Sequence, residues 1–571
     1  MDAMSRRDRS DAAHGGEGAP GLATQGIDWR KALAGVVQMI LLLVVVAGVY
    51  ARIVGLPLYV ADSGDEWGNT IAPLRVLFDR GDPGVFLHPA LYYYVTAAVY
   101  AALYAVVKAT GVVHGPLSIT DLFVLDDRYF VFAARGVSVL SAVLAMWALY
   151  ALAKSLWGRT AGCMAAALLA VCAPHAVYSD AVRVDSLFLA VFIYACSCIV
   201  RMLTDGDRSS YHRAGFFIGL AAGANYNGGI LFIWLIAAHL LRIGNGRRVS
   251  AQEDPSSAAP DTRTLCVALG LSLVGFVASN PFALLRLETF IRTFLFVSGL
   301  SVVEHPGAEG KGVLFYAAEL AHTTPYLLGV IGVSALAIAL FGNRAERFVL
   351  SLPVGYFALF SLVRTKYDRF ILPAEALFLL VASGLPAVLA RRLGQRRVPA
   401  MTATALSYAL LFVCLATMAP QSIPIPRHDA LPRSDALLFD WIEANAPPRS
   451  NILVESGILP LVDALITPDG FGAELRKSIA AVRPRLDHQF AGAVYIGGRT
   501  NYEPGSVAAR HIDYAIISPR NERYIESRCD VFPDVCAFYA ELRADGRIAY
   551  RTPDGFEMAT VYDLRGEANP S

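Results

Sequence analysis

The first residues whose types and spacing suggest chemistry are acidic side chains just after the first apolar run. Asp62, Asp65 and Glu66 lie close together there, and His88 follows shortly before the next apolar run. A carboxylate in the reduced dielectric near a membrane becomes more basic, which suits a general base. The plainer alternative is a solvated loop. We favour a site, because Glu66 and Arg75 would lie on an amphipathic helix that the acidic turn caps.

A second acidic position, Asp185, lies at the head of a later apolar run, two residues after Arg183. An ionised carboxylate inside a membrane helix costs about 2.5 to 3.5 kcal/mol on insertion scales, so such a residue indicates function. The alternative is an ion pair between Arg183 and Asp185 that merely ends a helix. We favour a functional Asp185.

Three basic residues, Arg364, Lys366 and Arg369, lie with Tyr367 in one short segment. The order of spans places this segment outside, although basic loops usually stay inside. A lipid headgroup or phosphate would hold it there, because Arg binds phosphate oxygens bidentately and Lys adds a point charge. The alternative is that the flanking spans are misassigned. Arg135, one turn into the second span, either joins this phosphate site or reaches the headgroups.

Other candidates carry weaker signals. Tyr226 lies in a tight polar turn between two short apolar runs. His305 lies in a long loop, residues 285 to 322, where a lone His is usually solvated. No zinc or EF-hand spacing, P-loop or Gly-x-Ser-x-Gly elbow is present, so we expect neither a metal nor a cofactor. Candidates for substrate contacts are Asp62, Arg183, Tyr226, His305 and Tyr367.

The elements that must position these residues are membrane helices. Of the 571 residues, 55% are hydrophobic and 17% are charged, against about 25% charged in soluble domains. Runs of about 20 apolar residues are long enough to cross a membrane. The sequence predicts eleven spans, at residues 31–54, 129–153, 160–178, 185–203, 214–226, 228–242, 263–284, 323–342, 347–363, 369–389 and 399–419.

The segment Leu91–Val107 is apolar enough to span, but we predict that it does not cross. Counting it as a span would export the basic pair Lys154 and Arg159, whereas basic loops prefer the cytoplasm. Its tyrosines suit a helix that lies on the outer leaflet. With eleven spans, the N-terminus is cytoplasmic and the tail is outside. The basic residues that then fall inside include Arg30, Lys31, Lys154, Arg159, Arg247, Arg248, Arg391 and Arg392.

The chain divides into three parts: a disordered cytoplasmic N-terminus at 1–28, a transmembrane domain at 29–420, and a soluble α/β domain at 421–571. Cys529 and Cys536 lie close together in this tail. If the tail is extracytoplasmic, a disulfide between them is the default expectation. The net charge is +1 and the basic residues lie between apolar runs, so we exclude nucleic acid as a partner.

These features together resemble the GT-C glycosyltransferases, and most closely the family 39 branch of protein O-mannosyltransferases and the aminoarabinose transferase of lipid A. The resemblance covers residues 30 to 420. Asp65 and Glu66 look like the family's acidic pair, and Asp185 looks like its second acidic residue. His88 with Pro89 looks like its His/Lys-Pro-Pro motif. Similar to its second-span and late motifs are Ala134, Arg135, Leu152–Gly158, Lys366, Arg369, Leu372 and Pro373.

Two positions depart from the family pattern. His88-Pro89-Ala90 lacks the second proline, and Asn225–Asn227 stands where many members have a lysine, which leaves the identity of the donor open. The tail is similar to tails on bacterial members of this group.

The resemblance implies an α-helical, GT-C-like enzyme of the bacterial inner membrane with a periplasmic tail. It would transfer a sugar, with inversion, from a polyprenyl phosphate to a hydroxyl of a lipid, glycan or protein. Asp65 would be the general base, with Glu66 as its neighbour or substitute. Asp185 would orient the acceptor or the base. The donor phosphate, whose charge grows in the transition state, would contact His88, Arg135, Lys366 and Arg369.

Two other functions fit a membrane protein with buried charges. A transporter or flippase of a lipid-linked substrate would commonly show internal repeats, and we find none in the sequence. An acidic site on one face also suits an enzyme better. A noncatalytic scaffold is the third alternative, and its membrane charges would be dispensable.

Overall fold

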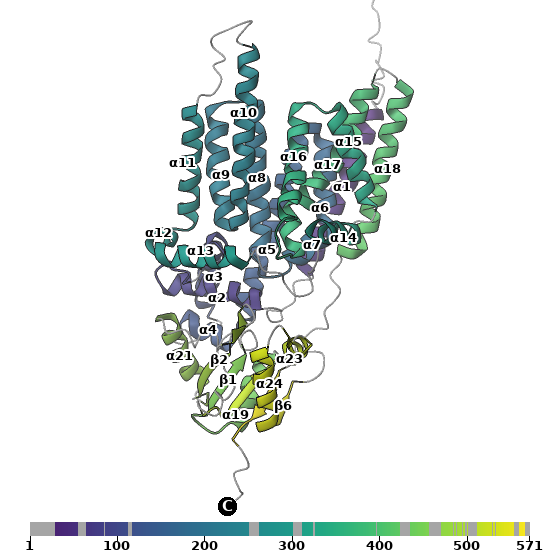
Figure 1. The fold of residues 1–571 in the computed structure, drawn as a ribbon. Coiled ribbons are helices and arrows are strands. Elements are labelled where there is room, and N and C mark those ends of the chain that lie inside the picture. Colours follow the sequence, from purple (N-terminus) through teal and green to yellow (C-terminus); the bar gives the residue numbers. More distant parts are fainter. Residues whose placement is uncertain are drawn as a thin grey trace, which may run out of the picture.

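The computed structural model describes residues 29–54, 64–84, 86–111, 117–249, 262–300, 311–323, 326–394, 397–422, 434–455, 470–483, 485–486, 488–493, 495–496, 499–500, 511–527, 529–530, 533–552 and 559–565. The predicted N-terminal segment 1–28, Asp62 and His305 lie outside these ranges. The described chain forms a helical bundle with a small α/β domain at one end (Figure 1). This confirms the predicted fold class.

The helices of the bundle follow the predicted apolar runs. By length and apolar composition, eight helices of the described chain could cross a membrane, or ten if two bent pairs each form one span. This set includes α3 (Leu91–Ala109) but omits two bundle helices of 17 residues, α9 and α16. The eleven predicted segments differ from the set of ten in that they leave out α3 and include α9 and α16. They are α1 (Trp29–Val54), α5 (Arg128–Trp157), α6 (Arg159–Ala170), α8 (Asp185–Thr204), α9 (Arg208–Ala224), α10 (Phe232–Val249), α11 (Thr262–Ser279), α15 (Leu327–Phe341), α16 (Arg344–Phe360), α17 (Leu372–Leu393) and α18 (Arg397–Ser422).

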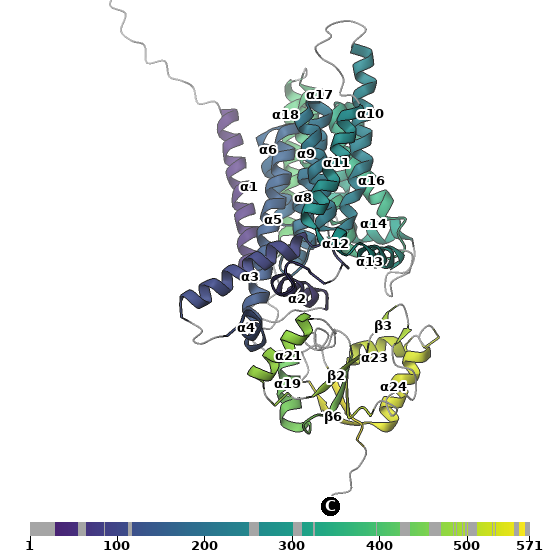
Figure 2. The ribbon, with the colours of Figure 1, turned by 90° about the vertical axis from the view of Figure 1, so that its left-hand side faces the viewer.

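Helix α3 lies across the ends of the bundle helices instead of running beside them (Figure 2). Tyr93 and Tyr100 are buried against the neighbouring helix α2 (Gly64–Phe78), where they donate to Asn69 and to the carbonyl oxygen of Thr70. On its other side, Val106 is exposed. One face of α3 therefore packs on protein and the other is exposed, although by length and composition α3 is also one of the candidate spans. That the segment does not cross stays a prediction.

Shorter elements gather at the end of the bundle that carries the α/β domain, which we call the tail-facing end (Figures 1 and 2). Helix α7 (Ala173–Ser179) is bent by 65° from α6, and Pro174 in its first turn cannot continue the hydrogen-bond ladder of α6. A short 3-10 helix, η2 (Asp368–Ile371), precedes α17. Also at this end are α4 (Ile119–Leu125), η1 (Tyr226–Leu231), α12 (Phe282–Leu285), α13 (Leu287–Leu300) and α14 (Gly312–Thr323).

The core of the bundle lies around α17, of which 89% of the most apolar stretch is buried, against 6% for α1. Helices α9 and α11 approach each other closely. A Cβ atom at Gly215 or Gly219 would lie 2.0 Å from the backbone oxygen of Ala268 or Ser272. Glycine therefore lets these two backbones touch, as small residues do between membrane helices.

The tail is an α/β domain, as predicted, around a five-stranded sheet of order β2-β1-β5-β7-β6. The first three strands are parallel, with Ile452 of β1 opposite Phe490 of β2 and Tyr514 of β5, while β7 pairs antiparallel with β5 and β6. The predicted disulfide between Cys529 and Cys536 is confirmed. The elements are α19 (Ser434–Asn445), β1 (Asn451–Glu455), α21 (Gly470–Val482), β2 (Gln489–Ala493), β3 (Tyr495–Ile496), β4 (Arg499–Thr500), β5 (Tyr514–Ile517), α23 (Pro519–Glu526), α24 (Pro533–Asp545), β6 (Arg547–Arg551) and β7 (Thr560–Asp563).

The tail rests on α2 and α4 through its helix α21. The ring of Phe471 lies edge-on to Phe78, with 6.0 Å between the centroids, and the Arg75 guanidinium lies 5.3 Å from the Phe471 centroid. Burial disfavours the charged form of Asp121 on α4, but hydrogen bonds, including one from Ser478 on α21, outweigh burial and lower the pKa of this carboxyl. Tail and bundle thus share one hydrophobic cluster.

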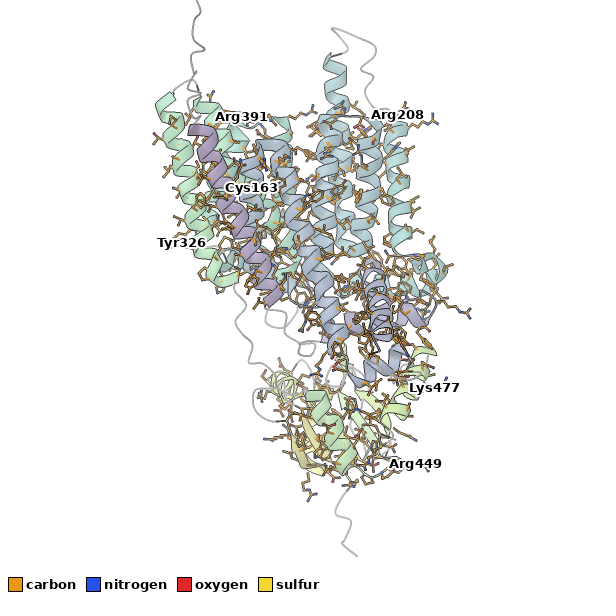
Figure 3. All side chains as sticks on the ribbon, turned by 180° about the vertical axis from the view of Figure 1, so that it is seen from behind. Cys163, Arg208, Tyr326, Arg391, Arg449 and Lys477 are labelled. Carbon is orange, nitrogen blue, oxygen red and sulfur yellow. A yellow bond between two sulfur atoms is a disulfide. The ribbon has the colours of Figure 1, made fainter. Side chains whose placement is uncertain are left out.

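Basic residues mark the opposite end of the bundle. Figure 3 shows Arg208 and Arg391 at the end away from the tail domain, whereas Arg449 and Lys477 lie within that domain. Arg208, at the start of α9, and Arg391, in the last turn of α17, therefore lie at the opposite end of the bundle from the C-terminal domain.

Candidate active site at the tail-facing end

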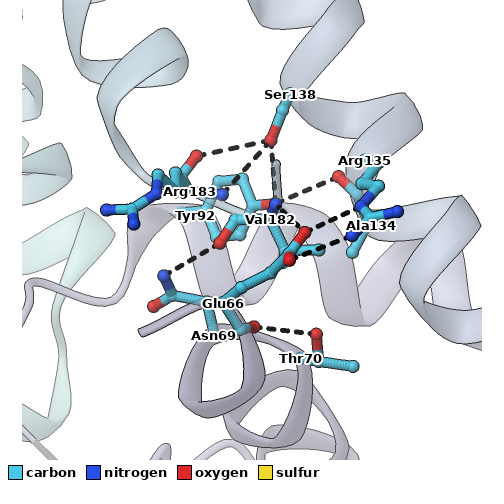
Figure 4. A network of polar contacts seen from close by, with 9 residues as sticks. All are labelled: Glu66, Asn69, Thr70, Tyr92, Ala134, Arg135, Ser138, Val182 and Arg183. Carbon is cyan, nitrogen blue, oxygen red and sulfur yellow. Dashed lines mark hydrogen bonds and ion pairs between the residues drawn. The ribbon is translucent and has the colours of Figure 1, made fainter. Parts of the chain in front are cut away.

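Glu66 lies with Asp65 in the first turn of α2, and its side chain is buried against α5. The two Glu66 oxygens accept hydrogen bonds from Nε and Nη2 of Arg135 at 2.7 and 3.0 Å. Oε1 also accepts from the backbone nitrogen of Val182 at 2.8 Å. This bidentate pair, with exposed fractions of 1% and 2%, joins α2, α5 and the segment between α7 and α8 (Figure 4). The side chain of Asp65 lies outside the described part of the structure.

Neighbouring side chains fix the position of this ion pair. Tyr92 on α3 donates to the carbonyl oxygen of Ala134, beside Arg135, at 3.0 Å. Asn69, about one helical turn after Glu66, donates to the carbonyl oxygen of Val182 at 3.0 Å and accepts from Tyr93 at 3.1 Å. Hydrogen bonds thus link α2, α3, α5 and the segment between α7 and α8 around this ion pair (Figure 4).

The pairing of Glu66 with Arg135 was not anticipated from the sequence. Arg135 was assigned either to the headgroups or to a phosphate, whereas the structure places it on a carboxylate 69 positions away. A buried guanidinium needs a compensating charge, so its place one turn inside an apolar helix was a signal that a carboxylate lies nearby.

Asp185 begins α8 and is buried, close to the end of α7. The hydroxyl of Tyr178 on α7 donates to Oδ1 of Asp368 at 2.5 Å. The guanidinium of Arg183 lies 5.4 Å from the centroid of the Tyr178 ring. Residues 178–185 therefore contact Glu66 through Val182 and contact η2 through Tyr178.

The predicted basic segment forms the turn that leads into η2. Lys366 is 2% exposed, and its Nζ donates to the carbonyl oxygen of Arg364 at 3.0 Å. The half-buried Arg369 has its guanidinium 4.9 Å from the centroid of the Tyr367 ring. Two cationic groups thus lie within one turn, which is the arrangement expected of an anion site.

His88 is half-buried in the loop between α2 and α3, which is held against α9, η1 and α11. Tyr226 donates to the carbonyl oxygen of Phe86 at 2.8 Å. Asn280, after α11, accepts from the backbone nitrogen of Ala90 and donates to the carbonyl oxygen of Gly223. Tyr226 therefore supports the His88 loop. Asn280 was missed from the sequence, where its only signal was a polar residue beside Pro281 in an apolar run.

No group of three or more His, Cys, Asp or Glu side chains that could hold a metal ion is found within the described ranges. The geometry described for this end therefore consists of carboxylates, basic groups and aromatic hydroxyls. Such groups can exchange protons and bind anions.

Comparison with known families identifies one match. Residues 130–256 match the model of the dolichyl-phosphate-mannose-protein mannosyltransferase family. No curated protein matches the chain by sequence.

Solved structures of similar fold cover almost the whole chain. The oligosaccharyltransferase of Archaeoglobus fulgidus in its apo form has 13% identity and a TM-score of 0.52, covering 95% of this chain and 75% of that one. ArnT from Cupriavidus metallidurans bound to undecaprenyl phosphate has 14% identity and a TM-score of 0.49, covering 92% and 98%. The chain is a multi-span membrane protein with the GT-C glycosyltransferase fold, and the resemblance predicted from its sequence is confirmed.

Proposed function

We propose that the chain is a membrane glycosyltransferase that moves a sugar from a polyprenyl-phosphate donor to an acceptor hydroxyl at the tail-facing end. One observation carries this proposal: residues 178–185 contact the acidic turn through Val182 and the basic turn through Tyr178. Such a transfer needs a base for the acceptor and a cationic group for the departing phosphate. The matched family model and the AglB structure of A. fulgidus with a dolichol-phosphate, at a TM-score of 0.50, support a lipid-phosphate donor.

In this proposal Asp65 is the general base and Glu66 is part of the scaffold. The oxygens of Glu66 accept hydrogen bonds from Arg135 and from the backbone of Val182. Because both of its oxygens are already engaged in these contacts, we assign Glu66 to the scaffold. Asp65 is the remaining carboxylate of the same turn. Arg135 is likewise engaged by Glu66, so we leave it out of the phosphate site.

The reaction proceeds by one displacement. The acceptor oxygen bonds to the anomeric carbon as the bond from that carbon to the phosphate oxygen breaks, and the electron pair leaves with polyprenyl phosphate. Asp65 takes the hydroxyl proton, and attack opposite the phosphate inverts the configuration. Asp185 orients the acceptor, while His88, Lys366 and Arg369 stabilise the growing phosphate charge. No metal or cofactor takes part.

We place this reaction on the outer face of a bacterial inner membrane, with the tail in the periplasm. The support is the position of Arg208 and Arg391 at the end of the bundle away from the tail, since positively charged loops prefer the cytoplasm.

Release of polyprenyl phosphate from a polyprenyl-phosphate hexose tests the proposal, with purified protein in lipid vesicles and a lipid extract as acceptor. We expect turnover by the wild type and a loss of about 10²- to 10⁴-fold in Asp65→Asn, as is typical for removal of a general base. The matched control is Glu288→Gln, which changes an exposed carboxylate paired with Arg292 on α13.

The outcomes separate the alternatives. Turnover of Asp65→Asn at the wild-type rate would contradict the assignment of the base. Wild-type protein that moves the donor across the bilayer without releasing polyprenyl phosphate would instead be a flippase. If neither is seen, the scaffold alternative is favoured.

A further inference from the structure

Arg52, near the tail-facing end of α1, is a buried arginine that the proposed reaction does not use. Its exposed fraction is 1%. Nε donates to Oγ of Ser179 at 2.8 Å, and Nη1 donates to the carbonyl oxygens of Ala170 at 2.8 Å and Gly48 at 2.9 Å. Nη2 lies 3.0 Å from Nδ1 of His175. All three nitrogen atoms of one guanidinium group thus have partners.

These contacts concentrate on the break between α6 and α7. Helix α6 ends at Ala170, and the last carbonyl groups of a helix have no partner within it. Unpaired backbone groups at membrane depth are costly. Arg52 donates a hydrogen bond to the carbonyl oxygen of Ala170. It also places a positive charge at this helix C-terminus, where a cation is favourable. The 65° bend between the two helices is therefore stabilised from α1.

The close approach of α1 makes these contacts geometrically available. A Cβ atom on Gly48 would lie 2.9 Å from the carbonyl oxygen of Ala170, which is the same oxygen that Arg52 binds. Glycine at this position therefore lets α1 reach the end of α6, one turn before Arg52.

What Arg52 holds is the helix that leads to the candidate site. Ser179, which accepts from Arg52, is next to Tyr178, whose hydroxyl donates to Asp368 in the basic turn. Three residues beyond Ser179, the backbone of Val182 donates to Glu66. The direction of α7 thus sets where Tyr178 meets η2, because a seven-residue helix pinned at its end has little freedom to shift.

We propose that Arg52 is a positioning residue for the donor phosphate, acting through α7, Tyr178 and Asp368 on the turn of Lys366 and Arg369. This inference rests on the proposed function and extends it to a residue outside the site. Loss of the guanidinium lets α7 tilt, which weakens the contact between Tyr178 and Asp368. The basic turn then binds the lipid phosphate less well, while the acidic turn keeps its own ion pair.

The test is a double-mutant cycle with Arg52→Lys and Tyr178→Phe. A lysine keeps the charge but lacks the fork that reaches Ser179, Ala170 and His175 together. We expect each single variant to raise the KM for the polyprenyl-phosphate sugar about tenfold, with kcat within about twofold of the wild type. The KM of the double variant should lie within about twofold of the KM of either single variant, because both substitutions interrupt the same chain of contacts.

Two further variants complete the design. Gln38→Leu removes another contact between α1 and α6, the hydrogen bond to Thr160 at 3.0 Å, and should leave KM unchanged. If Arg52→Lys does not fold, Ser179→Ala removes one Arg52 partner and takes its place in the cycle, with a smaller rise of about threefold.

The results distinguish failure of the inference from failure of the function. The positioning role would be overturned, with the enzyme still active, by either of two results. One is a double variant whose rise in KM equals the product of the two single rises, and the other is an unchanged KM in Arg52→Lys. A lower unfolding temperature with unchanged KM would likewise assign Arg52 to stability alone. Absence of turnover in the wild type would instead refute the proposed function.

Discussion

The two halves of the candidate site handle buried charge in different ways. In the acidic half, Glu66 and Arg135 neutralise each other through two hydrogen bonds, and Val182 adds a third. In the basic half, Lys366 donates to a neutral carbonyl group and Arg369 lies over an aromatic ring. A compensated pair is rigid but has little charge to offer a ligand, whereas two cationic groups within one turn can attract an anion. The first half resembles scaffold and the second resembles a binding surface.

The largest expected effect is on stability, from Glu66→Gln. The variant leaves the guanidinium of Arg135 buried without its carboxylate, and breaking such a pair typically costs about 3 to 5 kcal/mol. We expect a marked fall in the midpoint of thermal unfolding, measured by size-exclusion chromatography of heated samples.

The double variant Glu66→Met with Arg135→Met sharpens this result. Because it removes both charges, most of the lost stability should return, apart from the unpaired backbone nitrogen of Val182. An unfolding midpoint of Glu66→Gln equal to that of the wild type would show that the acidic half is not scaffold.

The next effect concerns the contact between the tail and the helix of the acidic half, α2. Phe471→Ala empties a buried position against Phe78 and Arg75 on the helix that carries Glu66. Truncation of a buried Phe costs about 3 kcal/mol or more. We expect faster cleavage of the tail in limited proteolysis. Ile548→Ala on β6, where the side chain is 44% exposed, is the control. Equal rates of cleavage in the two variants would contradict a stabilising contact between the tail and α2.

A smaller effect, on binding, is expected for Lys366→Met. The unfolding midpoint is measured beside binding, so that a loss of stability is separated from a loss of phosphate affinity. Binding of polyprenyl phosphate should weaken about 10- to 100-fold, or about 1.4 to 2.8 kcal/mol, because a charge-assisted contact is lost. Titration with the lipid phosphate in detergent measures this.

Lys311→Met, at an exposed lysine just before α14, is the matched control for lysine removal. If Lys366→Met unfolds the protein while binding per folded molecule is unchanged, then the basic half is scaffold as well, and the contrast between the two halves disappears.

Much of the architecture was predictable because it depends on local properties of the chain. Span length and apolar composition located the bundle helices. Figure 2 shows α3 across the ends of these helices, while its predicted place at the membrane surface stays a prediction. Two cysteines close together in a tail expected to be extracytoplasmic predicted the disulfide between Cys529 and Cys536, which the structure contains. Their chemical type also singled out Glu66, Arg135, Asp185 and Lys366, because ionisable side chains are costly to bury near a membrane and usually have a function there.

The sequence by itself thus determined which segments enter the membrane and which side chains are unusual there. Tertiary packing alone decided how those side chains pair: Glu66 with Arg135, Tyr178 with Asp368, and Arg52 with the break after α6. These partners are 69 to 190 positions apart. Pairing at that separation depends on helix contacts, which bring together a few charged groups among many apolar ones. Hydrophobicity selects the helices, but it does not specify which polar groups meet between them.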